Sequence, residues 1–119
     1  MPTPRGWQRL RSLRFEVVER SMLPALEPGD RILVDRAAYR HAPPQPGEIV
    51  VLRDPEGTGE PRVKRVAEPP GPLPAGSVWL LGDHPEESRD SRQYGAVASR
   101  LLLGRAWYRY FPRSREGML

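Results

Sequence analysis

The sequence contains no cysteine, which excludes disulfide bonds and thiolate metal sites. It has no run of about 18 apolar residues, the length that a helix needs to cross a bilayer, and no apolar segment typical of a secretory signal peptide. Histidine occurs only at His41 and His84, and neither lies in a setting typical of a catalytic triad. These absences predict a protein outside the lipid core, whose chemistry does not depend on histidine.

Lysine is also scarce, because Lys64 is the only lysine among the 19 basic residues. It lies in Val63-Lys64-Arg65-Val66, and on a strand Val66 shares its face. Burial against such neighbours lowers a lysine pKa from its usual value of about 10.4. An arginine could not act as a base, since it stays protonated. An exposed surface lysine is the ordinary alternative, but the pattern favours Lys64 as a general base.

The length of 119 residues, 15 prolines and 11 glycines favour one small, loop-rich β domain over a helical bundle. Short apolar segments separated by turn signals predict a mainly β fold, a small antiparallel barrel or folded sheet with Pro/Gly-rich loops. Ile32-Leu33-Val34 and Ile49 to Leu52 are the expected core. The predicted strands are residues 15–19, 31–35, 48–53, 62–67, 77–81 and a final strand within 101–111, with an irregular polar loop over 83–95.

Three separated segments suggest one catalytic apparatus: Ser21-Met22-Leu23-Pro24, the lysine segment, and Gly82-Asp83 running on to Asp90-Ser91-Arg92. A serine nucleophile needs a base to accept its proton, and the chain offers a lysine for this role. In order and spacing the segments resemble the motifs of the type I signal peptidases, over about residues 15–112. The resemblance implies a Ser/Lys serine endopeptidase that uses no cofactor and no metal. Ser21 is then the nucleophile and Lys64 the general base.

The same resemblance suggests supporting roles for four residues of the third segment. Ser88 matches a serine that hydrogen-bonds and orients the lysine, and Asp90 and Arg92 match a carboxylate and guanidinium that brace the loop. We expect Asp83 to fix the loop by accepting main-chain hydrogen bonds. Gly82 and Gly95 are expected to permit a backbone geometry that a side chain would obstruct.

The resemblance also implies a protein substrate whose N-terminal leader binds as an added, extended strand. Shallow apolar pockets would accept small residues one and three positions before the cut. Phe15, Val17 and Leu81 would flank the peptide, and Met22 would contribute to the pocket wall. The expected domain organisation is a basic flexible arm (residues 1–13), one signal-peptidase-like catalytic domain (14–112) and a C-terminal tail (113–119).

Three features depart from the family pattern. Typical members carry an N-terminal membrane anchor, and we expect none here, so the protein is predicted to be cytoplasmic, with weak peripheral membrane contact through the basic arm as the further option. Some members place an oxyanion-binding serine two residues before the nucleophile, where this chain has Glu19. On a strand Glu19 would share the face of Ser21 and repel a developing oxyanion, unless it turns toward an arginine. His84 replaces the usual asparagine after Gly-Asp and is interpreted as a loop residue.

A compact chain of this kind is similar to the maturation proteases of nickel-type superoxide dismutase, which remove an N-terminal leader. Two alternatives stay open. One is a self-cleaving, repressor-type Ser/Lys protease. The other is a non-enzymatic basic β-barrel binding module, suggested by the net charge of +4 and by aromatic residues near arginines. Core packing is the ordinary explanation for those aromatic residues, and we therefore expect no nucleic-acid partner.

Overall fold

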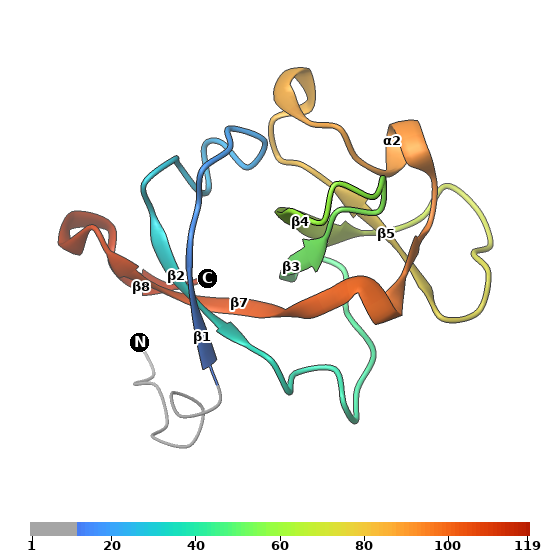
Figure 1. The fold of residues 1–119 in the computed structure, drawn as a ribbon, viewed down its shortest axis with the longest axis horizontal. Coiled ribbons are helices and arrows are strands. Elements are labelled where there is room, and N and C mark those ends of the chain that lie inside the picture. The colour runs from blue at the N-terminus through green and yellow to red at the C-terminus, as the bar shows by residue number, and fades with distance from the viewer. Residues whose placement is uncertain (1–11) are drawn as a thin grey trace.

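The structure is a computed structural model that describes residues 12–119 (Figure 1). The expected N-terminal arm therefore lies outside the described residues, apart from its last two positions. Within 12–119 the strands are β1 (Ser12–Glu16), β2 (Arg31–Asp35), β3 (Ile49–Arg53), β4 (Pro61–Ala67), β5 (Ser77–Leu81), β6 (Val97–Ala98), β7 (Leu102–Phe111) and β8 (Gly117–Met118). One short helix, α2 (Ser91–Tyr94), and 3-10 turns at Pro85–Glu87, Ser99–Leu101 and Arg113–Arg115 complete the elements.

The described strands form one antiparallel sheet in the order β1-β2-β7-β3-β4-β5-β6, with β8 added to β7. The long strand β7 pairs with β2 through one part of its length and with β3 through another, with register shifts in both ladders. Figure 1 shows the sheet folded along this strand, so that β1 and β2 stand apart from β3, β4 and β5. The expected small antiparallel β domain is confirmed.

Strand β3 lies between two hydrophobic clusters because the folded sheet covers both of its faces. Ile49 and Val51 belong to one cluster, together with residues of β1, β2 and the segment after β1, such as Met22. Val50 and Leu52 belong to the other cluster, with residues of β4, β5 and β6. An unbroken run of apolar residues on a strand is what burial on both faces requires. The core predicted from residues 32–34 and 49–52 is thus found, except that Leu33 is only partly buried.

Several predicted boundaries differ from the observed ones. The first strand ends at Glu16 and not at Glu19, because Val17 leaves the regular ladder and closes the next turn through Val17 N–H to the Asp30 carbonyl (2.8 Å). The loop over 83–95 contains the first 3-10 turn and α2. Residues 113–119, expected to be a tail, contain the last 3-10 turn and β8, which pairs with β7 at Tyr108 and Arg109.

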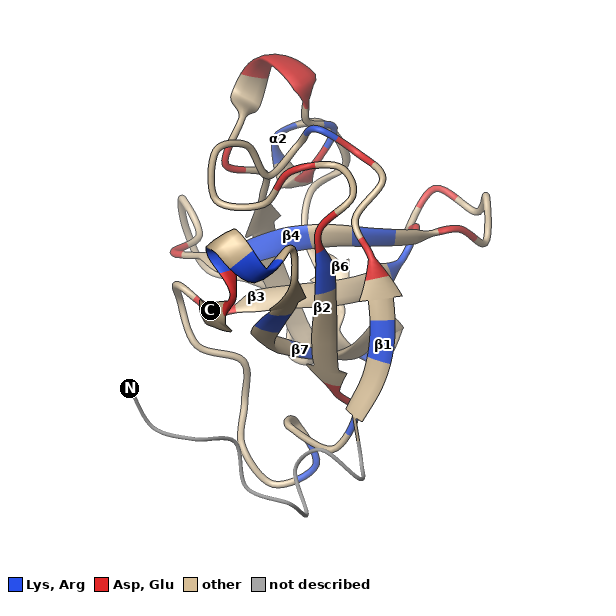
Figure 2. Cartoon of the chain, turned by 90° about the vertical axis from the view of Figure 1, so that its left-hand side faces the viewer, with Lys and Arg blue, Asp and Glu red and all other residues tan. Residues whose placement is uncertain are grey.

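Some of the loops that connect these strands lie together near α2, whereas the β2–β3 connection lies at the opposite end (Figure 1). Figure 2 shows acidic and basic stretches gathered in the loops near α2. Three chain segments meet there: the turn after β1, the middle of β4, and the loop between β5 and α2. They contain the three motifs that the sequence singled out, so the fold brings these motifs to one region.

Candidate active site

Ser21 and Ser88 converge on Gly82, and Lys64 contacts Ser88. The Ser21 carbonyl oxygen and the Ser88 hydroxyl oxygen lie 2.7 and 2.1 Å from the place where a Cβ on Gly82 would stand. The Lys64 Nζ donates a hydrogen bond to the Ser88 hydroxyl, at 3.3 Å. Ser21 and Lys64 are each 2% exposed, so both groups are almost completely withdrawn from water. The serine and the lysine predicted as a pair are therefore brought to the same part of the molecule.

The main chain of β4 fixes the place of Lys64. Lys64 is opposite Val50 in the β3–β4 ladder, and Val50 is fully buried. Burial of the amine lowers the pKa of Lys64, and the nearby charges of Glu19 and Asp90 oppose this shift only in part. Arg62 lowers the pKa further. The sequence-based interpretation of a buried lysine is thus matched by the structure, and the amine gives up its proton more readily than an exposed lysine does.

A hydrogen-bond chain holds the amine of Lys64 from one side. The Ser88 hydroxyl donates its proton to the Asp90 Oδ2, at 2.5 Å, so its oxygen is left to accept from Lys64. Asp90 is fully buried and also accepts from the Gly82 N–H (2.9 Å) and from the Arg92 Nη2 (2.6 Å). The observed Asp90–Arg92 ion pair corresponds to the expected brace of the loop.

Asp90 is held in its ionised form. Burial raises its pKa, but hydrogen bonds from Arg92, from the Gly82 N–H and from Ser88 outweigh that effect and hold the pKa well below the usual range. Asp90 also caps α2: its carboxylate accepts from the Arg92 N–H, and the Gln93 side chain accepts from the Asp90 N–H. The spacing Asp90-x-x-Gln93 is a capping-box signal that sequence reasoning missed.

The expectation for Asp83 was wrong in its detail. Its hydrogen bonds come from a side chain, because Arg65 Nε and Nη2 donate to its two carboxylate oxygens at 2.9 and 2.8 Å. Arg65 also donates to the Gly47 carbonyl at 2.8 Å. Asp83 therefore ties the Gly82 turn to β4, the strand that contains Lys64. Residue identity alone does not predict this pair, since the two residues are separated by a loop and by β5.

The hydroxyl and the main-chain N–H of Ser21 have no hydrogen-bond partner among residues 12–119. Lys64 donates to Ser88 and not to Ser21. The Ser21 carbonyl accepts from the His84 N–H at 2.8 Å. This contact of His84 was missed because it uses the main chain and leaves no signal in residue identity. Ser21 is thus anchored by its carbonyl, while its main-chain N–H and its hydroxyl are unpaired among the described residues.

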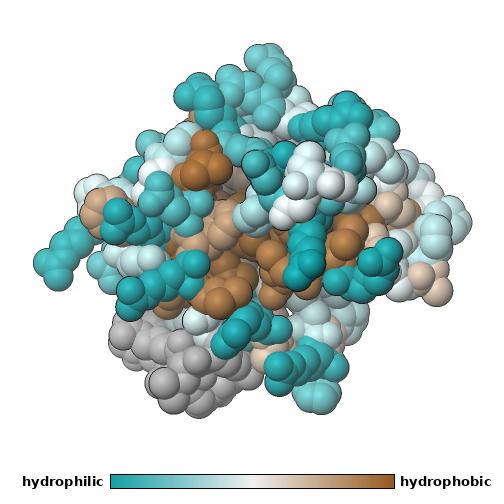
Figure 3. Space-filling view, viewed as in Figure 1, coloured by the Kyte–Doolittle hydropathy of each residue, from teal (hydrophilic) through white to brown (hydrophobic). Residues whose placement is uncertain are grey.

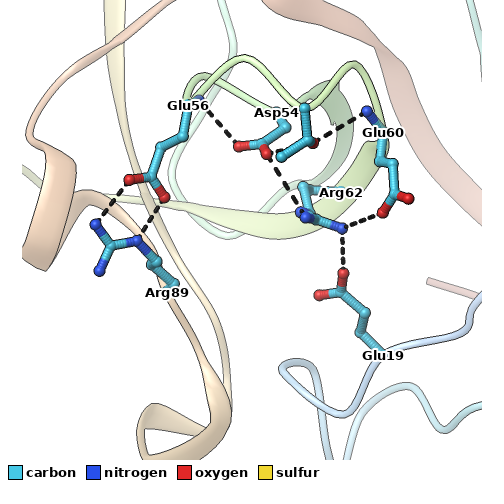
Figure 4. Close-up of polar contacts among 7 residues, drawn as sticks. Glu19, Asp54, Glu56, Glu60, Arg62 and Arg89 are labelled. Atoms are coloured by element: carbon cyan, nitrogen blue, oxygen red, sulfur yellow. Dashed lines mark hydrogen bonds and ion pairs between the residues drawn. The ribbon is translucent and has the colours of Figure 1, made fainter.

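Glu19 pairs with an arginine, the second of the two expected outcomes. Its Oε1 accepts from Arg62 Nη1 at 2.5 Å (Figure 4). Strand alternation does not apply to Glu19, because β1 ends three residues earlier. Arg62 also contacts Glu60 (3.1 Å) and Asp54 (3.5 Å), so its positive charge faces three carboxylates. Sequence reasoning did not identify Arg62.

Two cavities adjoin the site. The apolar one, of about 10 Å³, lies beside Ser21 between the end of β1 and β4 and is lined by Phe15, Val17, Val18, Glu19, Ser21, Met22, Pro61, Arg62 and Val63. Figure 3 shows apolar surface in the middle of the face seen in Figure 1, framed by hydrophilic residues. Three of the predicted peptide-flanking residues therefore line one cavity. Leu81 does not line it, because it pairs with Arg65 on the far side of β4.

The second cavity, of about 190 Å³, is polar and lies beside Lys64. Its lining consists of Glu19, Asp54, Glu56, Arg62, Lys64, Glu87, Arg89 and Tyr94. No three His, Asp or Glu side chains within residues 12–119 are placed to hold a metal ion. In the same residues, no helix has the length and apolar character needed to span a bilayer.

Substitution of Gly82 by alanine is expected to damage the site directly. The new Cβ would stand 2.1 Å from the Ser88 hydroxyl oxygen and 2.7 Å from the Ser21 carbonyl oxygen, so both segments would have to move. Such overpacking costs about 1–3 kcal/mol, and displacement of both serines should lower peptide cleavage at least tenfold. Thermal melting and cleavage assays on Gly82→Ala check this. Gly71→Ala is the control, because nothing lies within 4 Å of its Cβ position.

Comparison with known proteins gives consistent matches over most of the chain. The model of a family described as "Signal peptidase, peptidase S26" matches residues 10–73 and 69–111. A probable signal peptidase I-1 of Synechocystis sp. is 30% identical, with 99% of this chain and 91% of that protein aligned. A mitochondrial ATP-independent inner membrane protease subunit 1b of Arabidopsis thaliana is 34% identical over 83% of this chain and 70% of that protein. The mitochondrial inner membrane protease subunit 2 of Schizosaccharomyces pombe is 34% identical over 84% and 65%, respectively.

Proposed function

Because the chain belongs to the signal peptidase family, peptidase S26, and is therefore a serine peptidase that removes leader peptides, we propose that Ser21 is its nucleophile and Lys64 its general base. The observation that carries the proposal is the burial of the only lysine beside Ser88, at the point where the Ser21 segment also arrives. Family membership favours this proposal over the non-enzymatic β-barrel module. The Ser88–Asp90–Arg92 arrangement supports it further.

In the proposed acylation step, the neutral Lys64 amine takes the proton of the Ser21 hydroxyl as the oxygen attacks the scissile carbonyl. The carbonyl oxygen becomes an oxyanion, and the Ser21 N–H, which has no partner among the described residues, would donate to it. When the carbon–nitrogen bond breaks, the Lys64 ammonium gives its proton to the leaving amine, and the acyl group stays on Ser21. Water then repeats the sequence: Lys64 takes its proton, hydroxide adds to the ester, and Ser21 leaves as the hydroxyl.

The contacts of Ser88 explain how Lys64 would be oriented for this step. The hydroxyl proton is committed to Asp90, so the Ser88 oxygen accepts one N–H of the lysine and leaves the amine lone pair to point elsewhere. Lys64 donates to Ser88 and not to Ser21, which is compatible with the proposal, since catalytic hydrogen bonds often tighten only when substrate binds. Asp90 remains ionised and acts through Ser88, not as a proton-transfer group.

Ser88→Ala is expected to lower kcat by about 10- to 100-fold, because the lysine loses the acceptor that orients it. The KM for a leader peptide should change little, since Ser88 does not line the apolar cavity. Ser91→Ala is the matched control: this nearby buried serine accepts from the Leu80 N–H at 2.9 Å and makes no contact with Lys64. Steady-state kinetics on both folded variants check the prediction. An equal loss of kcat in both would assign Ser88 a merely structural role.

We propose that the leader binds in extended form beside Val18, with small side chains before the cut. The N–H and the carbonyl of Val18 have no partner among the described residues, so a peptide strand can pair with them. The neighbouring apolar cavity of about 10 Å³ has room for about one water-sized group, such as a methyl. Alanine before the cut should therefore be cleaved and leucine rejected, which mass spectrometry of a synthetic peptide series would test.

We further propose that residues 14–112 form the catalytic domain and that the physiological substrate is a precursor of nickel-type superoxide dismutase. The support is the sequence resemblance and the short β3–β4 connection, residues 54–60. We propose that the protein acts in the cytoplasm. We also propose peripheral membrane contact, because the names of several relatives refer to membrane proteases. Cleavage of that precursor, compared with an unrelated secretory precursor and with and without anionic vesicles, tests both points. Cleavage of the secretory precursor alone would reject the superoxide dismutase assignment.

A further inference from the structure

The apolar and polar cavities share one wall. Glu19 and Arg62 line both of them, and the two side chains are joined at 2.5 Å (Figure 4). Ser21 lines the apolar cavity, and Lys64 lines the polar one. The ion pair therefore stands between two spaces of different size and polarity, and a peptide lying across Ser21 would have one neighbour of the scissile bond on each side of it.

The chemistry of cleavage assigns the polar cavity to one side of the cut. A base that takes the proton of Ser21 must hand it to the leaving amine, so the released part of the peptide passes the amine of Lys64. We propose that the polar cavity binds the side chain that follows the scissile bond, and that the Glu19–Arg62 pair separates it from the apolar subsite. This inference rests on the proposed function of Ser21 and Lys64.

The charges of the lining indicate which side chains the polar cavity accepts. Four carboxylates and two guanidiniums line the cavity, so with Lys64 in its neutral form the lining has a net charge of −2. The carboxylates are Glu19, Asp54, Glu56 and Glu87, and the guanidiniums are Arg62 and Arg89. Outside the lining, Arg20 pairs with Glu87 and Glu60 pairs with Arg62, which adds one charge of each sign. The cavity therefore favours a lysine or arginine side chain after the cut and disfavours an acidic one.

Ion pairs fix the walls of this cavity. Arg89 donates through Nε and Nη2 to the two carboxylate oxygens of Glu56, at 2.5 and 2.7 Å, which joins the loop after Ser88 to the β3–β4 connection (Figure 4). Arg20 Nε donates to Glu87 at 2.7 Å and joins the segment before Ser21 to the same loop. The cavity is thus bordered by three chain segments, and its volume of about 190 Å³ leaves room for a long side chain.

Three peptides that differ only in the residue after the cut, namely lysine, glutamine or glutamate, test the proposal. At low ionic strength kcat/KM for the lysine peptide should exceed that for the glutamate peptide by about tenfold, with glutamine in between. Because the charges lie near solvent, the ratio should fall toward one in about 1 M salt. Equal kcat/KM values for the three peptides, or a preference for glutamate, would overturn the proposal.

Two variants of the wall give opposite expected changes. Glu87→Gln removes a negative charge and should lower the lysine-to-glutamate ratio about threefold, whereas Arg89→Gln removes a positive charge and should raise it by a similar factor. A general loss of activity from loop displacement cancels in this ratio, so a merely structural role would leave it unmoved. Shifts in the same direction would reject the subsite. The proposed function would fail separately, if Ser21→Ala or Lys64→Ala still cleaved all three peptides.

Discussion

Lys64→Met is expected to lower the rate of leader-peptide cleavage by about 10²- to 10⁴-fold, while the domain stays folded. Methionine fills the space of the lysine stem but offers no proton acceptor. Lys64→Arg should be equally inactive, because a guanidinium stays protonated. Single-turnover cleavage of an alanine-containing peptide measures the loss. Full activity in either variant would contradict the assignment of Lys64 as the base.

Lys64→Met should also raise the stability of the folded state, and this gain should depend on pH. Burial lowers the pKa of Lys64 in the folded protein, so at low pH the folded state carries the full cost of a buried ammonium. Between the lowered pKa and the unfolded value of about 10.4, the folded protein releases the proton and the cost shrinks as pH rises; above about 10.4 it vanishes. Lys64→Met should therefore melt at a higher temperature than the wild type near neutral pH, with the difference closing at alkaline pH.

The pH dependence of cleavage follows from the same shift. The wild-type kcat/KM should fall as the pH is lowered through the depressed pKa of Lys64, since only the neutral amine accepts the Ser21 proton. The midpoint of this fall should lie below the usual lysine value of about 10.4. A midpoint at or above that value would mean that burial does not activate the amine.

Ser21→Ala is expected to abolish cleavage, with a loss of at least about 10⁴-fold, because no other group in the proposed mechanism can form the acyl-enzyme. Stability should change little, since the hydroxyl of Ser21 has no hydrogen-bond partner among the described residues. Intact-protein mass spectrometry after reaction with an activated acyl ester should show one acyl group on the wild type and none on the variant. Acylation of Ser21→Ala at the wild-type rate would move the nucleophile elsewhere.

Ser77→Ala provides the matched control for this experiment. Ser77 lies at the start of β5, and its hydroxyl donates to the Pro74 carbonyl at 2.6 Å on an exposed turn. The variant removes the same atom from the same residue type at a position outside both cavities. It should keep the wild-type kcat and acylation, so a loss in Ser21→Ala alone reflects the position of the hydroxyl and not serine content or folding.

The strands could be predicted from the sequence because their signals are local. Residues 31–35 and 77–81 were predicted with the observed bounds, since apolar β-branched residues alternate or run together between turn signals there. The end of the first strand was misplaced because its cause is a long-range contact: Val17 bonds to Asp30, thirteen residues away. The fold along β7 and the two-sided burial of β3 likewise follow from pairings that no single segment reveals.

In the candidate site, too, local motifs could be predicted from the sequence, whereas contacts between distant segments could not. Motif order was enough to suggest Ser21, Lys64, Ser88, Asp90 and Arg92 as one group, and the structure brings them together. Arg62 and Arg65 were missed because their partners, Glu19 and Asp83, lie far away in the sequence and their own position on a strand is unremarkable. The direction of Glu19 could not be settled either, since it depends on whether a cation from β4 reaches it.

Lys64 and Ser21 belong to parts of the chain that differ in rigidity. Lys64 lies opposite Val50 of β3, a strand that is paired along both edges and covered on both faces, so the main chain that holds Lys64 can move only if the sheet opens. Ser21 belongs to a turn outside the ladders, held to the rest by the Ser21 carbonyl and by neighbouring ion pairs. When a substrate peptide binds, we therefore expect the turn that contains Ser21 to move, while the strand that contains Lys64 keeps its position.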